Sequence, residues 1–279
     1  MRVTVLGASG FVGRHLSAAL EARGFTVTRA SARDVDAAAR ACEGADAVVN
    51  LAGASISKRW TPAHKAEMRS SRVDLTRRLI DRFAGLVAPP LAYVSASAVG
   101  YYGMSDDATF TEESPPGRDF LAELCVAWER EAFRAREFGA RVAIIRSGLV
   151  LGPDGGLLAF LLTPFRLGLG GRIGNGKQWM SWIHIDDAVG VYIHALERGD
   201  GVYNATAPNP VTNERFTQTL ARTVRRPAIL PVPPLALQAL LGEGASIAVR
   251  GQRVLPQRTR ESGYIFRYET IDAALAAIV

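Results

Sequence analysis

Three glycines at a fixed spacing, Gly7, Gly10 and Gly13, are the first residues in this chain whose types and positions can do chemistry. They follow an apolar run at residues 3–6 and open a stretch of helical periodicity that continues over residues 15–23. A diphosphate can sit on a helix N-terminus only where the backbone turns sharply and carries no Cβ at the closest approach. This turn is therefore predicted to hold a dinucleotide pyrophosphate. Its other predicted contacts are Ser9, Phe11 and Val12.

The residues after the second expected strand predict which nicotinamide cofactor is bound. NAD requires a carboxylate for its ribose 2′-hydroxyl, whereas NADP carries a phosphate there that a carboxylate would repel. In this region Arg29, Ser31 and Arg33 occur, and no Asp or Glu appears before Asp34. A guanidinium offers a planar fork of donors suited to phosphate. The sequence predicts NADP(H), with Ser31 and Arg33 around the 2′-phosphate and Arg29 assisting; the alternative is a solvated loop arginine.

Ser97 and Tyr101 are the candidates for acting on a substrate. Both follow an apolar strand, and catalytic groups of doubly wound sheets gather at the carboxyl ends of strands. A free tyrosine is a poor base at neutral pH, because its reference pKa is about 10. Two tyrosines, Tyr101 and Tyr102, that merely shape a pocket wall are therefore the alternative to a direct role in proton transfer.

Residues expected to bind a small substrate follow a glycine-rich turn in the second half of the chain. Lys177, Gln178 and Trp179 come directly after it, and Tyr102 and His184 are expected in the pocket wall. His184 also stands beside two carboxylates, which suggests an acid–base triad. The alternative is that Asp186 caps a helix and His184 is simply packed, since Asp is strongly preferred at N-caps.

The elements that must position these residues alternate between strand and helix patterns through the first 150 residues. Such alternation is typical of a parallel sheet covered by helices on both faces. The expected strands are residues 2–6, 26–30, 47–51, 91–94 and 142–146, and the expected helices are residues 15–23, 35–42, 62–83 and 120–138. The prediction is an α/β, Rossmann-type doubly wound sheet over residues 1–150, to which parts of 185–205 return, with a smaller C-terminal substrate lobe in 151–279.

Several further segments have the form of family motifs. They are Asn50-Leu51-Ala52-Gly53 with Arg59-Trp60 and residues 71–73, S-A-S-A-V-G-Y-Y-G at 95–103, R-S-G-L-V-L-G at 146–152, P-F-R-L-G-L-G-G at 164–171, W-I-H-I-D-D at 182–187, and a tail with residues 252–256 and 263–264. With these segments nearly the whole chain resembles the atypical extended short-chain dehydrogenase/reductases known as epimerase family proteins of unknown substrate. The resemblance implies cofactor contacts from Leu51, Ala52, Glu67, Arg72 and Val150, while the small residue Gly53 itself allows the backbone to approach the adenosine.

The same comparison shows that a catalytic pair is missing. Extended reductases use Tyr-x-x-x-Lys, in which the lysine lowers the pKa of the tyrosine. When Glu129 is matched to the acid that commonly follows this pair, Leu121 and Cys125 occupy the two positions. Two functions therefore stay open: an NADP(H)-dependent oxidoreductase or epimerase that uses Ser97 and Tyr101, and a non-catalytic NADP(H)-binding sensor or scaffold.

Composition and charge exclude several other classes. The 279 residues are 48% apolar, enough for a sizeable core, but no apolar run reaches the roughly 18 residues of a membrane span, and no separate signal segment precedes the first strand. Cys42, Cys125 and four scattered histidines predict no metal site. A cytoplasmic protein without a membrane partner is expected.

The charge balance points to a small partner. The net charge is +6, and residues 211–279 hold nine arginines against five acids. This excess favours an anionic small molecule or a solvated face, and no nucleic-acid motif accompanies it. By analogy with extended reductases, a homodimer would share the helices at 62–83 and 120–138.

Overall fold

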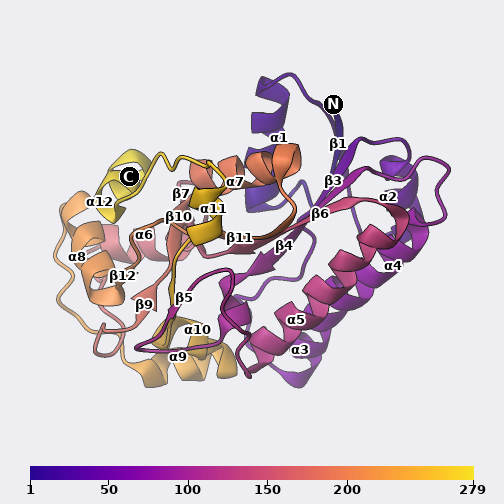
Figure 1. Ribbon diagram of the computed structural model, residues 1–279. Helices are drawn as coiled ribbons and strands as arrows, with labels where there is room; N and C mark the ends of the chain where they lie inside the picture. Colours follow the sequence, from indigo (N-terminus) through magenta and orange to yellow (C-terminus); the bar gives the residue numbers. More distant parts are fainter.

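Six parallel strands form the central sheet of the computed structural model, which describes residues 1–279 (Figure 1). Their order is β11-β6-β4-β3-β1-β2. The bounds are β1 (Arg2–Leu6), β2 (Thr26–Ala30), β3 (Ala47–Asn50), β4 (Ala92–Ala98), β6 (Arg141–Ser147) and β11 (Gly201–Ala205). After β1 the chain goes to β2 on one side and then to β3 on the other. Ligands of such sheets bind at this reversal, beyond the carboxyl ends of the strands.

Helices cover both faces of the sheet because side chains of successive strand residues point to opposite sides. On one face, α1 (Phe11–Ala22) and α7 (Ile185–Arg198) pack on Val3, Val5 and Val94. On the other face, Val48 and Tyr93 contact α2 (Val35–Cys42), α4 (Leu75–Phe83) and the region of α5 (Phe120–Phe133). The predicted Rossmann-type doubly wound fold is confirmed.

Two differences from the expected elements concern the site. The strand expected at 91–94 continues to Ala98, because residues 95–98 stay paired with β6, and Ser97 therefore lies within β4. The helix expected at 62–83 is α3 (Pro62–Arg69) and α4 joined by a π-helical turn, η1 (Ser70–Asp74). Such turns are frequent at functional sites, and Arg72 lies in this one.

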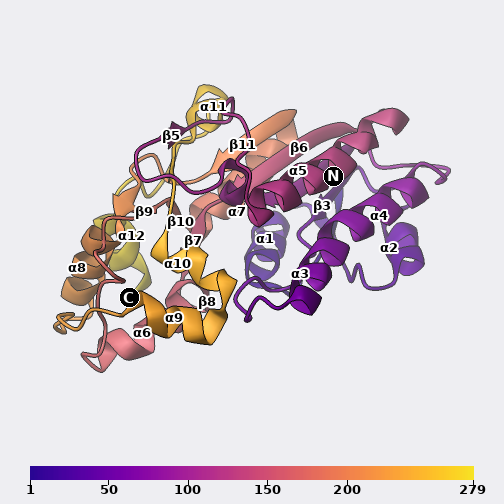
Figure 2. The same cartoon turned by 90° about the horizontal axis from the view of Figure 1, so that it is seen from below.

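A second core forms beyond the sheet around α6 (Leu158–Arg166), α8 (Asn213–Thr223) and α12 (Ile271–Ile278); this part is called the C-terminal lobe (Figures 1 and 2). Its strands are β7 (Leu149–Gly152), β8 (Gly155–Gly156), β9 (Trp179–Met180), β10 (Trp182–His184) and β12 (Val211–Thr212), with β5 (Thr109–Phe110) paired to β13 (Arg253–Val254) nearby. The remaining helices are η2 (Val99–Tyr102), η3 (Arg134–Phe138), α9 (Pro234–Leu241), η4 (Glu243–Ala245), α10 (Ser246–Val249) and α11 (Gln257–Glu261).

The segment at α9 joins the lobe to the Rossmann unit. The Trp60 amide donates to the Leu241 carbonyl at 3.1 Å, and the Arg59 guanidinium donates to the Ala239 carbonyl. The indole of Trp60 then packs edge-on against Phe120 of α5. These contacts fix α9 beside the carboxyl edge of the sheet, where the chain's candidate site lies.

Two buried carboxylates attach the C-terminal segment to the sheet. Glu112 accepts bonds from the amides of Asn204 and Arg258, and Asp187 accepts bonds from the amides of Arg267 and Tyr268 at 2.8 Å each. The hydroxyls of Thr259 and Tyr264 donate to the same two carboxylates, so the segment is held by both its main chain and its side chains. No helix is both long and apolar enough to traverse a bilayer, and no cluster of three or more His, Cys, Asp or Glu side chains could hold a metal ion.

Candidate functional site

The glycine turn after β1 forms one wall of a cradle, and the turn after β3 forms the other. Gly7 has a φ of +82°, and a Cβ there would lie 3.0 Å from the Leu51 carbonyl carbon and 3.1 Å from the Ala52 nitrogen. A Cβ on Gly13 would lie 2.4 Å from the Gly7 carbonyl oxygen. Larger residues at either position would therefore force the turns apart.

Helix α1 begins behind this cradle with an N-terminus that no side chain caps. Its N-cap is Gly10, no side chain bonds to its first amides, and no acidic residue occupies its first turn. The free N–H groups and the helix dipole at such an end favour an anion. Ser9, Phe11 and Val12 lie in the same turn. The residues present thus fit a dinucleotide pyrophosphate.

The carboxyl end of β2 is hydrogen-bonded to the glycine turn through the Gly7 amide, which donates to the last strand residue at 3.2 Å. Ser31 and Arg33 follow directly, and the Arg33 amide donates to the Ser31 hydroxyl at 3.3 Å. The Arg33 side chain is exposed and forms no ion pair, whereas Arg29 pairs with Glu21 of α1 at 2.8 Å. Ser31 and Arg33 are therefore available to bind a phosphate, whereas the guanidinium of Arg29 is paired with Glu21 of α1.

Arg72 reaches from η1 to the turn after β3. Its Nη2 donates to the Ala54 carbonyl at 2.9 Å, and its Cζ lies 2.9 Å from the position of a Cβ on Gly53. The guanidinium also faces the ring of Trp128 at 5.4 Å. Burial lowers the pKa of Arg72 below its ordinary value. This places a half-buried cation beside the wall of the cradle.

The other predicted cofactor residues surround the cradle at different depths. The Phe11 ring packs against the glycines of the β7–β8 hairpin, and Val150 of β7 packs against the same core as Phe11. Glu67 of α3 is exposed and lies 2.9 Å from Nδ1 of His64, and this hydrogen bond lowers the pKa of Glu67. The Phe11 contacts place the hairpin beside the glycine turn, whereas the contact of Glu67 lies within α3 itself.

A buried network of side chains occupies the carboxyl end of β4. The Ser97 hydroxyl donates to Glu129 at 2.6 Å, and Arg146 holds the same carboxylate through two bonds of 2.9 and 2.8 Å. Arg146 also donates to the Tyr102 hydroxyl at 3.0 Å, which donates to Asn204 at 2.7 Å. Burial raises the pKa of Tyr102 to about 12, although the neighbouring Arg146 acts to lower this pKa. The polar atoms of this network are paired with one another.

Tyr101 differs from the rest of this network because its hydroxyl has no hydrogen-bond partner in the protein. Its ring lies under the guanidinium of Arg146, 3.2 Å from ring centroid to Cζ, and packs edge-on against Tyr102. A cation over an aromatic face fixes the ring's position. Tyr101 is half-buried, so its ring is held while its hydroxyl stays available.

The positions that carry the Tyr-x-x-x-Lys pair in extended reductases hold no acid–base group here. Leu121 packs against Gly100, 3.1 Å from the place of a Cβ there. Cys125 is buried, and burial raises the pKa of its thiol to about 12, so that it stays protonated. Neither Glu129 nor Arg146 was predicted from the sequence to be a site residue. Arg146 carries a signal, because it directly follows the apolar run at 142–145, whereas Glu129 carries none, because Arg130 and Glu131 follow it.

The residues predicted to bind substrate separate into two groups. Gln178 is buried and donates to the carbonyls of Ile173 and Ala248, and Tyr102 is enclosed by the network described above. Lys177 is exposed and forms no ion pair, and half-buried Trp179 contacts Arg253. Lys177 and Trp179 are therefore accessible to a ligand, whereas Gln178 and Tyr102 form hydrogen bonds in the protein interior.

His184, not Asp186, is the N-cap of α7, and this corrects the sequence-based interpretation. Its Nδ1 accepts a bond from the Asp186 amide at 3.0 Å, while the ring stacks on Tyr268 at 3.9 Å. Asp187 is buried, where it accepts bonds from the C-terminal segment. His184 is 5% exposed, so it is a capping residue and not a member of an acid–base triad.

The cap makes stability depend on pH. Burial lowers the pKa of His184, so the unfolded chain, with its pKa near 6.5, binds the proton more readily and stability falls as the pH drops below about 6.5. His184→Asn keeps a good cap without the titration. Between about pH 7.5 and 5.5 the Tm of the variant should fall by about 2 °C less than that of the wild type. Equal falls in thermal scans would contradict this assignment.

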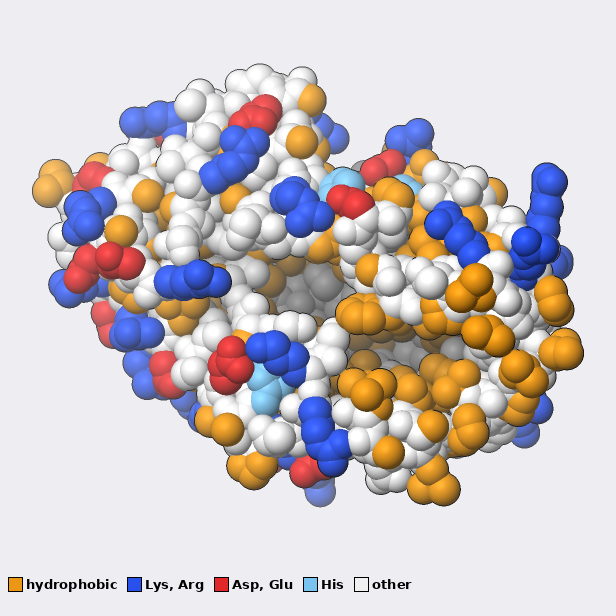
Figure 3. All heavy atoms as spheres, turned by 180° about the vertical axis from the view of Figure 1, so that it is seen from behind, with side chains coloured by type: hydrophobic (Ala, Val, Ile, Leu, Met, Phe, Trp, Pro, Cys, Tyr) orange, Lys and Arg blue, Asp and Glu red, His pale blue; other side chains and the backbone are white.

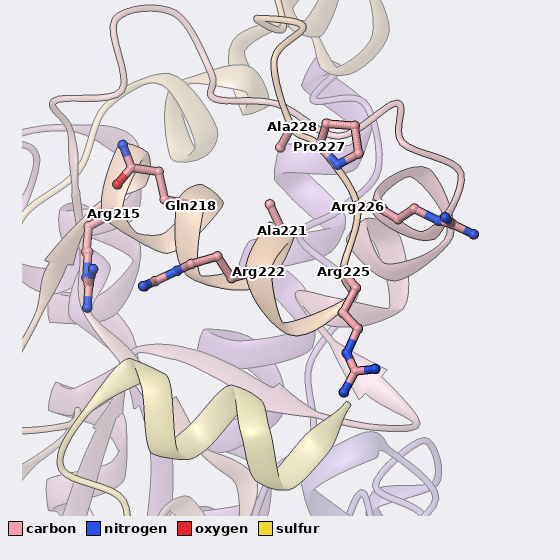
Figure 4. A pocket seen from close by; sticks show the side chains of 8 residues that line it. All are labelled: Arg215, Gln218, Ala221, Arg222, Arg225, Arg226, Pro227 and Ala228. Carbon is pink, nitrogen blue, oxygen red and sulfur yellow. The ribbon is translucent and has the colours of Figure 1, made fainter.

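The molecular surface is hollowed between the Rossmann unit and the C-terminal lobe, as seen from behind in Figure 3. A separate cavity of about 630 Å³ lies on the outside of the lobe at the end of α8. Four arginines line it, but Arg215 and Arg222 share Asp272, and the side chains of Arg225 and Arg226 point away from each other (Figure 4). They do not converge on one ligand group, so the cradle is the candidate site.

The doubly wound sheet, the glycine cradle at its switch point and the open N-terminus of α1 define a nucleotide-binding protein with the extended short-chain dehydrogenase/reductase fold. The model of the NAD dependent epimerase/dehydratase family matches residues 3–206, and the chain belongs to this family. A second model, for a domain of unknown function, DUF1731, matches residues 232–278.

Relatives cover the full chain. The chain is 43% identical over 302 residues to "Epimerase family protein SDR39U1 homolog, chloroplastic" of Arabidopsis thaliana. This alignment covers 100% of this chain and 87% of the plant protein. The crystal structure of human epimerase family protein SDR39U1 with NADPH has 38% identity and a TM-score of 0.93, with 100% and 99% of the two chains covered. A nucleoside-diphosphate sugar epimerase from Corynebacterium glutamicum has 35% identity and a TM-score of 0.81, covering 99% of this chain and 57% of that one. These findings confirm the predicted family.

Proposed function

We propose that this protein binds NADP(H) in the cradle between the turns after β1 and β3, and that it is an oxidoreductase or epimerase acting on a small carbonyl or hydroxyl compound. The observation that carries the proposal is the uncapped N-terminus of α1 behind Gly7 and Gly13, which face Leu51 and Ala52. NADPH bound in the human relative supports the same cofactor. Val150, Glu67 and Arg72 border the cradle in this assignment.

Cofactor choice rests on the end of β2. Ser31 and Arg33 would bind the 2′-phosphate of NADP(H), and Arg29 is left to its pair with Glu21. The bound cofactor supplies a hydride for reduction, or accepts one in the opposite direction. Arg72 would hold the cofactor's sugar–phosphate groups beside Gly53, where its guanidinium is fixed by the Ala54 carbonyl.

Arg33→Ala tests the choice of cofactor. A charge-assisted hydrogen bond to phosphate contributes about 1.5–3 kcal/mol to the binding free energy. Its loss should lower NADPH affinity about 10- to 100-fold, while NADH affinity changes little. Fluorescence titrations of both nucleotides give the two ratios, with Arg29→Ala as the matched control of small effect. An equal loss for NADPH and NADH would remove Arg33 from the 2′-phosphate site.

On the substrate side, Tyr101 would donate its hydroxyl proton toward a carbonyl oxygen. Arg146 fixes the Tyr101 ring, and the network through Glu129 holds Ser97, whose oxygen can still accept a bond from a substrate hydroxyl. Orientation of the carbonyl against the cofactor then replaces the strong acid that a Tyr–Lys pair would supply. Lys177 is the cation suited to an anionic substrate, with Trp179 beside it.

Tyr101→Phe tests this chemistry. Oxidation of NADPH should be followed by absorbance over a panel of aldehydes and ketones, and turnover in the variant should fall by about 100-fold or more, the range of a lost proton donor. NADPH affinity should stay within about twofold of the wild type, since Tyr101 is not among the residues assigned to the cofactor. Unchanged turnover would transfer the role to another group.

A non-catalytic NADP(H) sensor is the second candidate, and one observation favours it. Leu121 and Cys125 leave no lysine near Tyr101, and Ser97 already donates its proton to Glu129. Tight NADPH binding without turnover on the whole panel would support this candidate. A homodimer through α3, α4 and α5 and a cytoplasmic location stay predictions.

A further inference from the structure

Seven large apolar side chains lie exposed on the C-terminal lobe and form what is called here the apolar face. Their exposed fractions run from 53% for Leu230 to 80% for Ile229. Figure 3 shows hydrophobic side chains gathered around a hollow on this lobe, at the right of the view. The members are Phe160, Leu167, Leu169, Ile229, Leu230, Leu235 and Leu240. Apolar patches of this kind mark interaction sites in soluble proteins.

The segments that carry these side chains run side by side. A Cβ on Gly171 would lie 1.6 Å from the Leu230 carbonyl oxygen, and Ile173 pairs with Val232. The Arg226 side chain also donates to the Arg166 carbonyl at 3.1 Å. The loop after α6 and the loop before α9 therefore present their apolar residues together.

Helix α9 extends this face and buries none of its residues. Seven of its eight residues, Pro234 to Leu241, are apolar, yet none is buried. A helix in a globular protein ordinarily buries an apolar stripe against the core. The contacts of α9 with Arg59 and Trp60 are made by its backbone carbonyls, and six of its eight residues are exposed.

The segments that carry the apolar face hold basic charges only. Residues 155–185 and 215–242 contain no Asp or Glu. The basic side chains among them that form no ion pair are Arg166, Arg172, Lys177, Arg225 and Arg226. A contact between two copies across a two-fold axis would bring these uncompensated cations together. The face therefore complements an anionic partner.

We propose that the apolar face docks peripherally on an anionic lipid bilayer. The tips at Leu167–Leu169 and Ile229–Leu230 enter the boundary between headgroups and acyl chains, and Arg225 and Arg226 contact lipid phosphates. Apolar insertion combined with arginines is the physical requirement for stable binding at a membrane surface. This departs from the expectation that the protein has no membrane partner, which rested on the absence of spanning segments.

The test is co-sedimentation of the full chain with vesicles of phosphatidylcholine alone or containing phosphatidylglycerol. The wild type should bind the anionic vesicles at least about tenfold more tightly. The double variant Ile229→Ser with Leu230→Ser should lose about tenfold or more of that affinity. Arg225→Gln with Arg226→Gln should lose roughly 25-fold, since each basic residue near such a surface contributes about fivefold.

Ile265→Ser is the matched control, because Ile265 is 87% exposed but lies outside the apolar face. This variant should bind vesicles like the wild type, and all variants should keep NADPH affinity and Tm. Absence of binding to anionic vesicles, or an equal loss in the Ile265 control, would overturn the proposal. So would light scattering that shows a dimer dissociated by the Ile229 and Leu230 substitutions, because the face would then join two copies.

Discussion

Replacing Gly13 by valine is expected to abolish NADPH binding, with a loss of more than about 100-fold, or roughly 3 kcal/mol. The reason is steric: a Cβ at this position would lie 2.4 Å from the Gly7 carbonyl oxygen and 2.8 Å from the Ala8 Cα. Both are backbone atoms of the turn that we propose binds the pyrophosphate, so the turn itself must open. Equilibrium titration by fluorescence measures the effect.

Gly85→Ala provides the matched control for this substitution. A Cβ at Gly85 would meet only the Arg82 carbonyl oxygen at 3.6 Å, which is an ordinary contact. NADPH affinity should therefore stay within about twofold of the wild type. A folded Gly13→Val protein that binds NADPH normally would show that the glycine turn is not the phosphate site.

The second large effect concerns stability. Arg146 is 3% exposed and Glu129 is 5% exposed, and each is the principal charged partner of the other. Arg146→Met would leave the Glu129 carboxylate buried with Ser97 as its remaining partner, which should lower the free energy of unfolding by about 3–5 kcal/mol. Urea unfolding of the purified protein measures this change.

A double variant separates the pair from its surroundings. Replacing both Arg146 and Glu129 by methionine removes the two buried charges together, and the unfolding free energy should recover by at least about 2 kcal/mol relative to Arg146→Met alone. If Arg146→Met cost under about 1 kcal/mol, or if the double variant were no more stable than the single one, the ion pair would not be the element that holds this part of the site.

The local part of the site could be predicted from sequence because its residues are neighbours in the chain. Gly7 and Gly10 lie in the turn between β1 and α1, and Gly13 lies in the first turn of α1. The strands at 2–6 and 26–30 coincide with β1 and β2, since short segments rich in β-branched residues between turns favour strands. The missing lysine at Cys125 was equally visible.

The rest depended on tertiary packing. Ser97 and Glu129 are 32 residues apart, and their bond exists only because α5 packs on β4. Asp186 has the better N-cap propensity, but the His184 ring reaches the first free amide. Helix α9 was not predicted, and the structure leaves all of its residues outside the core. Secondary-structure propensity reflects only the local backbone preference of a residue. The contacts described here depend on the elements that pack against each residue, which propensity does not include.

Titration of the wild-type protein with NADPH and with NADH tests the central claim most directly. With Ser31 and Arg33 at the end of β2 and no carboxylate there, NADPH should quench or shift fluorescence at saturation, and NADH should bind at least about tenfold more weakly. Equal affinities would contradict the assignment of the 2′-phosphate site. If neither nucleotide binds, the proposal that the cradle formed by Gly7, Gly13, Leu51 and Ala52 binds NADP(H) is wrong.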